Sequence, residues 1–134
     1  MNSQELTKYG FDSWHKFNFE LMDTILELIP KKSGAYVIRY KELFGRFKVK
    51  SDLLYFGSAI NKLGGMRARV KHYFKPGPTQ ETSKRINKFM QKIKGLEISY
   101  VVVEDNKKAR QLERDLRNRY EGEHGEFPPW NRKA

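Results

Sequence analysis

The chain has 134 residues, of which 27 are Lys or Arg and 16 are Asp or Glu, so its formal net charge is +11. This length suits one domain with a sizeable core, and so basic a domain favours nucleic acid as the partner, with a lysine-rich solvated surface as the plainer alternative. The absence of cysteine excludes disulfides, zinc ribbons and thiol catalysis.

The sequence also lacks the marks of a membrane or secreted protein. It has no run of about 18 apolar residues, the length that spans a bilayer. Residues 1–7 do not combine a basic region with a following apolar one, as a signal peptide does. We therefore expect a cytoplasmic protein with no membrane partner.

The first expected element is an amphipathic helix over residues 12–29, ended by Pro30. Its apolar residues recur every three or four positions: Phe17, Leu21, Ile25 and Leu28. We expect residues 1–30 to form an N-terminal helical extension that packs on the body of the protein, with binding to a partner as the alternative. Residues 31–134 then form the main domain.

Segments rich in β-branched and aromatic residues predict three strands: residues 35–40, 53–57 and 97–103. The first two are joined by the connection 41–51, and we expect them to pair antiparallel. Helices are expected over three further segments: residues 66–74, the stretch between Pro78 and Gly95, and residues 107–121. A polar loop, 122–125, follows the last helix. This order predicts an α/β domain with a small three-stranded, mostly antiparallel sheet flanked by helices.

Two tripeptides stand out at the strands: Gly34-Ala35-Tyr36 and Tyr55-Phe56-Gly57. Arg69 precedes Tyr73 by four residues, so both lie on one face of their helix. Further along come Glu113 in the last helix and Asn131 in an aromatic, Pro-rich tail. In this order the residues resemble the signature of the GIY-YIG nucleases, over roughly residues 33–131.

The resemblance implies a metal-dependent endonuclease that hydrolyses phosphodiester bonds, with DNA preferred over RNA as the substrate. It implies six catalytic residues: Tyr36, Tyr55, Arg69, Tyr73, Glu113 and Asn131. Glu113 would bind Mg²⁺ or Mn²⁺, and Arg69 would bind the scissile phosphate.

Tyr55 is then the candidate base and Tyr36 its positioning partner, while Tyr73 contacts phosphate or water. Asn131 would hold Glu113 or a loop in place. From the residues alone, the tyrosines also suit a hydrophobic core, and Glu113 also suits an ion pair with Arg117 four residues later.

Three features depart from the family pattern. Ser58 follows the second tripeptide, where many members carry Lys, and Lys62 and Lys71 are the alternatives for that role. The connection between the tripeptides and the stretch from Tyr55 to Arg69 are both longer than in compact members. These departures keep open a second function, a nucleic-acid-binding module whose nuclease site is lost or unused.

Basic side chains outside the catalytic set are expected to contact the phosphate backbone without reading sequence, although a solvated basic face would look the same. They are Arg67, Lys71, His72, Lys84, Arg85, Lys88, Arg110, Arg114 and Arg117. No pair of histidines has the spacing of a zinc site, and His15 and His124 have no context that suggests a function. The sequence leaves the oligomeric state and the biological role open.

Overall fold

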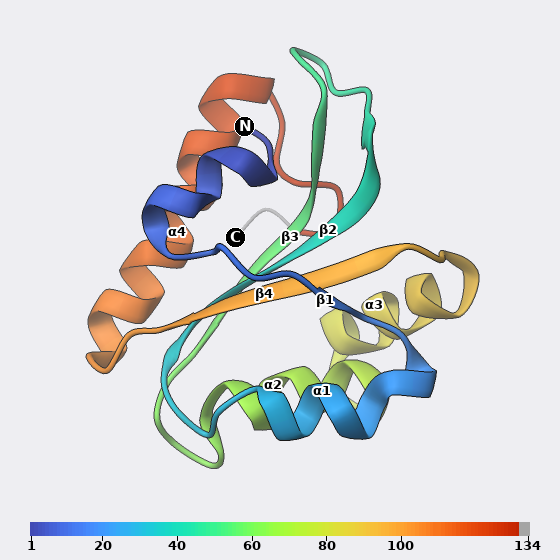
Figure 1. Ribbon diagram of the computed structural model, residues 1–134, viewed down its shortest axis with the longest axis vertical. Helices are drawn as coiled ribbons and strands as arrows, with labels where there is room; N and C mark the ends of the chain where they lie inside the picture. Colours follow the sequence, from blue (N-terminus) through green and yellow to red (C-terminus); the bar gives the residue numbers. More distant parts are fainter. Residues whose placement is uncertain (132–134) are drawn as a thin grey trace.

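The computed structural model describes residues 1–131, which form one antiparallel sheet covered by helices on both faces (Figure 1). The strands, in the spatial order β1-β4-β2-β3, are β1 (His15–Lys16), β4 (Leu96–Val102), β2 (Gly34–Phe44) and β3 (Ser51–Ala59). The α-helices are α1 (Met22–Leu28), α2 (Gly65–Phe74), α3 (Glu81–Lys92) and α4 (Asn106–His124). Two short 3-10 helices, η1 (Ser3–Tyr9) and η2 (Phe19–Leu21), complete the described chain.

Strand register decides which residues meet. β2 pairs with β3 from Gly34 opposite Ala59 to Ile38 opposite Tyr55, which places Tyr36 directly opposite Gly57. On its other side β2 pairs with β4, so β3 is left as an edge strand. The first tripeptide and the second therefore lie side by side in the sheet.

Two hydrophobic clusters lie on the two faces of the sheet, because successive side chains of a strand point to opposite sides. Tyr36 and Ile38 pack with α1, α2 and α3, whereas Ala35 and Val37 pack with η1 and α4. The segment 1–30 contributes to both clusters, with Leu6 in the second and Ile25 in the first. Within residues 1–131, no helix combines the length and the apolar character needed to cross a bilayer.

The α/β class and the antiparallel pairing of the first two predicted strands are confirmed, but the sheet has four strands, where the sequence predicted three. The additional strand, β1, falls inside the predicted helix 12–29, which is wrong over its first half. His15 pairs with Ile98 across the sheet, and the Asn18 side chain accepts a hydrogen bond from the Leu21 amide at 3.0 Å. That cap starts the helical turns six residues later than the apolar spacing predicts.

The predicted polar loop 122–125 is also wrong, because α4 continues to His124 and ends at Gly125, which has a left-handed φ of 75°. The predicted connection 41–51 is shorter than expected, since β2 runs on to Phe44. His124, for which the sequence suggested no context, is fully buried, and its Nε2 lies 2.6 Å from the Met1 amino nitrogen.

Candidate active site

A pocket of about 300 Å³ lies at the edge of the sheet, where α2 and α4 flank β3. Its polar lining contains two phenol hydroxyls, one carboxylate, one serine and four guanidinium groups: Tyr36, Tyr55, Glu113, Ser58, Arg69, Arg110, Arg114 and Arg117. A larger cavity, about 660 Å³, lies elsewhere, between the β1 region, α3 and β4, and contains none of the predicted catalytic residues.

The pocket wraps around the edge of the sheet. Tyr55 and Ser58 point to opposite faces of β3, since they are three residues apart in a regular strand. Tyr55 lies with Tyr36 on the face covered by α2, and Ser58 lies on the face covered by α4. Because β3 has no neighbouring strand on its outer side, both side chains reach the same pocket.

The glycines of the two tripeptides allow close packing at the site. A Cβ atom at position 57 would lie 2.4 Å from Cζ of Tyr36, so the Tyr36 ring crosses β3 where only glycine leaves room. A Cβ atom at position 34 would lie 2.2 Å from the Val101 carbonyl oxygen and 2.7 Å from the terminal methyl of Met66. Gly57 thus lets the Tyr36 ring lie against β3, and Gly34 lets β2 lie close to β4 and Met66.

Three tyrosine hydroxyls form one chain. The Tyr36 and Tyr73 oxygens are 2.5 Å apart, and Tyr73 donates a longer hydrogen bond, 3.4 Å, to Tyr55. Either hydroxyl can be the donor in the contact between Tyr36 and Tyr73, whereas Tyr55 is the acceptor in its contact with Tyr73. This arrangement leaves the proton of Tyr55 free to be donated to a group in the pocket.

Tyr73, which was expected to contact phosphate or water, does not line the pocket. It is buried behind Tyr36 and Tyr55, with 1% of its surface exposed. Its hydroxyl instead joins the other two tyrosines, and its ring packs edge-on against both. The structure thus places Tyr73 as a support for the two pocket tyrosines.

Burial is the main reason that the pKa of each of the three phenols is raised. For Tyr55, the nearby Glu113 carboxylate raises the pKa further, while the Tyr73 hydrogen bond, Arg69 and Arg117 lower it. The net direction remains upward, so all three phenols are neutral near pH 7. Tyr55 is therefore a hydrogen-bonding group in this state, and it would need additional positive charge to act as a base.

Glu113 lies in the pocket and forms the ion pair with Arg117 that the sequence offered as one of its two roles. Its side chain lines the pocket with 19% exposure, and its Oε2 lies 2.8 Å from Nε of Arg117, a contact that is an ion pair and not a well-aligned hydrogen bond. Ser58 Oγ donates a 3.3 Å hydrogen bond to Oε1. Burial raises the pKa of Glu113, although Arg117 and Ser58 oppose that shift.

The guanidinium groups around Glu113 differ in their partners. Within residues 1–131, Arg69, Arg110 and Arg114 form no ion pair, whereas Arg117 is paired with Glu113. Arg69 is exposed and lies one turn before Tyr73 on α2, as the spacing predicted. Three unpaired guanidinium groups at one pocket favour a polyanionic ligand.

Asn131 contacts the site indirectly. Its side chain accepts a hydrogen bond from the Phe56 amide at 2.9 Å and donates one to the Phe56 carbonyl at 3.0 Å. The amide of Trp130 donates to the Leu54 carbonyl at 2.9 Å, so the tail pairs with the outer edge of β3. Of the two roles that were expected for Asn131, the geometry favours holding a segment, here the strand that carries Tyr55, over a contact with Glu113.

The predicted phosphate-contacting residues fall into two groups. Arg110, Arg114 and Arg117 line the pocket, whereas the others lie outside it. Arg67 donates to the carbonyls of Ile29 and Glu27 and so joins α2 to the end of α1. The remaining residues lie on α2 and α3: Lys71, His72, Lys84, Arg85 and Lys88.

Sequence reasoning missed one partner in the site, Ser58, which it treated only as a departure from the family pattern. Position 58 is 55 residues from Glu113, and no local pattern joins a strand serine to a helix carboxylate at that separation. The alternation of side chains along 53–59 was the available signal, since it places Ser58 on the α4 face.

The donor set can be compared with the needs of a divalent cation. Among the described residues, no group of three or more His, Cys, Asp or Glu side chains is placed to hold a metal ion. Glu113 supplies one carboxylate, with hydroxyl oxygens from Ser58 and Tyr55 in the same pocket. Such hard oxygen donors suit Mg²⁺, which keeps several waters and accepts phosphate oxygens in its shell.

Comparisons with known proteins find no family model, no curated protein and no solved structure that matches this chain. The interpretation of the pocket therefore depends on its own residues and geometry.

Proposed function

We propose that this chain is a metal-dependent endonuclease of the GIY-YIG type that hydrolyses phosphodiester bonds in DNA. The observation that carries the proposal is that Tyr36, Tyr55, Arg69 and Glu113, which are far apart in the sequence, line one pocket. Arg110 and Arg114, which form no ion pair within residues 1–131, lie at the same pocket, and their charge suits a phosphate backbone.

The residues take distinct roles in hydrolysis. Arg69 binds the scissile phosphate with its planar guanidinium and stabilises the negative charge that grows on the phosphate oxygens. Tyr55, neutral and with its proton directed to the pocket, orients the attacking water. The water oxygen bonds to phosphorus and gives its proton to solvent, while the bond to the leaving oxygen breaks and that oxygen takes up a proton.

Glu113 is the residue that would hold Mg²⁺ or Mn²⁺, with Ser58 beside it. When bound, the ion supplies Lewis-acid stabilisation of the phosphate oxygens and lowers the pKa of water. Arg117 must then share or release the carboxylate, because it occupies Oε2 in this state.

The first test of this proposal is the substrate and metal requirement of the unmodified protein. Supercoiled plasmid, branched DNA and single-stranded RNA are incubated with the protein in Mg²⁺, in Mn²⁺ and in EDTA. We expect nicking of DNA with either metal and none in EDTA. Cleavage that persists in EDTA, or cleavage of RNA alone, would contradict the proposal.

A second candidate function is a nucleic-acid-binding module without nuclease activity. The observation that favours it is that Glu113 already has two partners, an ion pair with Arg117 and a hydrogen bond from Ser58. Ser58 stands where many members of the family carry Lys. The two functions differ in one result. Salt-dependent binding of DNA with no cleavage in any divalent metal would support the binding module and reject the enzyme.

A further inference from the structure

The hairpin between β2 and β3 presents apolar side chains to solvent at its end. We define the tip loop as residues 45–50, which connect Phe44 to Ser51. Phe47 is 78% exposed and Val49 is 72% exposed, and Leu43, just before the loop, is 56% exposed. Single exposed apolar residues are ordinary, but three at one end of a hairpin, Leu43, Phe47 and Val49, suit a contact surface.

The tip loop is held firmly despite this exposure. The Lys48 amide donates to the His124 carbonyl at 3.0 Å, and the Phe47 amide donates to Glu126 Oε2 at 2.6 Å. Arg46 donates to the Phe127 carbonyl at 2.6 Å and pairs with Glu126 at 3.0 Å. The end of α4 and the segment after it therefore fix the loop backbone. One edge of the Phe47 ring lies against Gly125, and most of the side chain remains exposed to solvent.

The backbone conformation of Val49 is a second observation that points to a defined loop shape. Its φ is +55°, in a region that β-branched residues rarely adopt. A short surface turn could relax if a glycine or asparagine occupied this position. A strained, exposed valine between two lysines is better explained by a contact that the tip makes than by folding of the hairpin alone.

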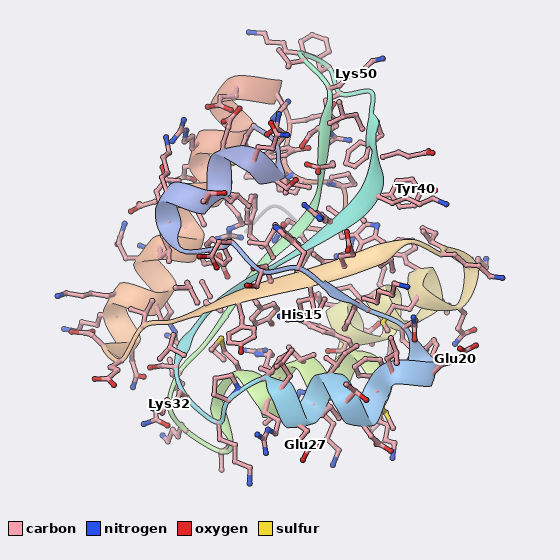
Figure 2. The ribbon with its side chains drawn as sticks, in the orientation of Figure 1. His15, Glu20, Glu27, Lys32, Tyr40 and Lys50 are labelled. Carbon is pink, nitrogen blue, oxygen red and sulfur yellow. The ribbon has the colours of Figure 1, made fainter. Side chains whose placement is uncertain are left out.

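Charge indicates what the tip contacts. Lys48 and Lys50 flank Val49, and both are exposed. Within the described residues neither forms an ion pair, and Lys50 lies at the end of the hairpin (Figure 2). An apolar side chain flanked by ammonium groups matches a base step flanked by phosphates, which is how wedge residues bind duplex DNA. An apolar groove on a protein would not require the flanking lysines.

The tip also lies on the strand that carries the candidate active site. β3 runs along the long axis of the molecule from the hairpin toward the loop before α2 (Figure 1). Lys50 and Tyr55 are five residues apart, about 17 Å at roughly 3.4 Å per residue. That span corresponds to about five base pairs at roughly 3.4 Å each. One duplex can therefore reach both.

We propose that the tip loop is a second DNA-binding element, in which Phe47 inserts between bases near the cleavage site and Lys48 and Lys50 bind the phosphates on either side. This inference rests on the proposed function, because it takes DNA as the ligand. It adds a deformation step: DNA that is easily unstacked, such as a mismatch or a branch, becomes the preferred ligand.

The test uses a Glu113→Gln background, so that DNA is bound without being cut. The probe is a 30-bp duplex with 2-aminopurine at successive positions, whose fluorescence rises when the base is unstacked. We expect a rise at one position about five base pairs from the cleavage site. Phe47→Ser should abolish the rise and weaken binding about tenfold, as loss of one base stack does.

Two matched variants control the result. Leu28→Ser changes another exposed apolar residue, 41% exposed and on α1 outside the hairpin, and should leave fluorescence and affinity unchanged. Phe47→Trp keeps an aromatic ring and should keep both signals. If Phe47→Ser binds as tightly as its parent and gives the same fluorescence, the wedge is rejected, and the patch fits a protein partner.

Failure of this inference can be separated from failure of the proposed function. If the unmodified protein cuts DNA with Mg²⁺ but no probe position brightens in the Glu113→Gln protein, the wedge is wrong and the nuclease stands. If the Glu113→Gln protein does not bind the duplex and the unmodified protein does not cut DNA, both proposals fall.

Discussion

At the scale of single residues, the tyrosine chain is the most constrained part of the site. Tyr36 and Tyr73 are each only 1% exposed, and each hydroxyl has the other as its nearest hydrogen-bond partner. Removing one hydroxyl leaves the other without its nearest partner, and an unsatisfied buried hydroxyl costs about 1–3 kcal/mol. The two hydroxyls should therefore show strong coupling.

We predict that Tyr36→Phe and Tyr73→Phe each lower the free energy of unfolding by about 1–3 kcal/mol, because each removes one hydroxyl of the buried pair. The double variant should lose less than the sum of the two, because it leaves neither hydroxyl unpaired. Urea unfolding of the four proteins measures the coupling. Strict additivity would show that the 2.5 Å contact contributes nothing.

The raised pKa of Glu113 should make both the free energy of unfolding and metal binding depend on pH. Burial raises its pKa above the ordinary value of 4.5, so the folded state holds the proton more tightly than the unfolded chain does. The free energy of unfolding should then fall as pH rises from about 4.5 to the raised value, because the unfolded chain loses its proton first. Metal binding, which needs the carboxylate, should be lost as pH falls through that raised value.

Carbon NMR of the Glu113 side chain, titrated from pH 3 to pH 8, measures this pKa directly. Arg117→Gln should move the midpoint to still higher pH, since the Arg117 charge stabilises the carboxylate. The ordinary value of 4.5 for a glutamate carboxyl serves as the reference. A Glu113 midpoint at or below that value would contradict the burial argument.

At the scale of elements, the edge strand β3 depends on its glycine. Gly57→Ala places a methyl group against the Tyr36 ring, and we predict a loss of about 1–3 kcal/mol from overpacking. Gly45→Ala is the matched control, because nothing lies within 4 Å of its Cβ position. Thermal unfolding compares the two. Equal stabilities would show that the ring moves aside without cost.

The sequence could predict the elements whose signals are local. The strand 53–57, the helix 66–74 and the shared face of Arg69 and Tyr73 all follow from patterns within a few residues, and all are present. β1 could not be predicted this way, since only its pairing with Ile98, 83 positions beyond His15, makes it a strand. The apolar spacing of residues 12–29 predicted a helix throughout, but residues 15–16 form a strand because they pair with β4.

The same limit applies to the pocket. Its tyrosines and Arg69 were predicted, but the Ser58–Glu113 hydrogen bond and the contact of Asn131 with Phe56 join residues 55 and 75 positions apart. Such contacts depend on how α4 and the tail lie against the edge of β3. Only the folded chain determines that placement.

At the scale of the whole molecule, the charge of +11 predicts strongly salt-dependent binding to DNA. Arg114→Gln should lower the slope of log affinity against log salt by about one, because it removes one pocket cation that has no ion pair among the described residues. Lys16→Gln changes an exposed cation on β1, at the opposite edge of the sheet, and should not alter the slope. Equal slopes for both variants would favour a diffuse basic surface over binding at the pocket.

The central claim is that Arg69 and Glu113 form one site that cleaves the phosphodiester bond. The most direct measurement is the single-turnover rate of DNA nicking in Mg²⁺ for the unmodified protein, Arg69→Ala, Glu113→Gln and the control Glu121→Gln. We predict that the two pocket variants lose about 100-fold or more in rate while they remain folded, and that Glu121→Gln cuts like the unmodified protein. Rates for Arg69→Ala and Glu113→Gln equal to that of the unmodified protein would contradict the account.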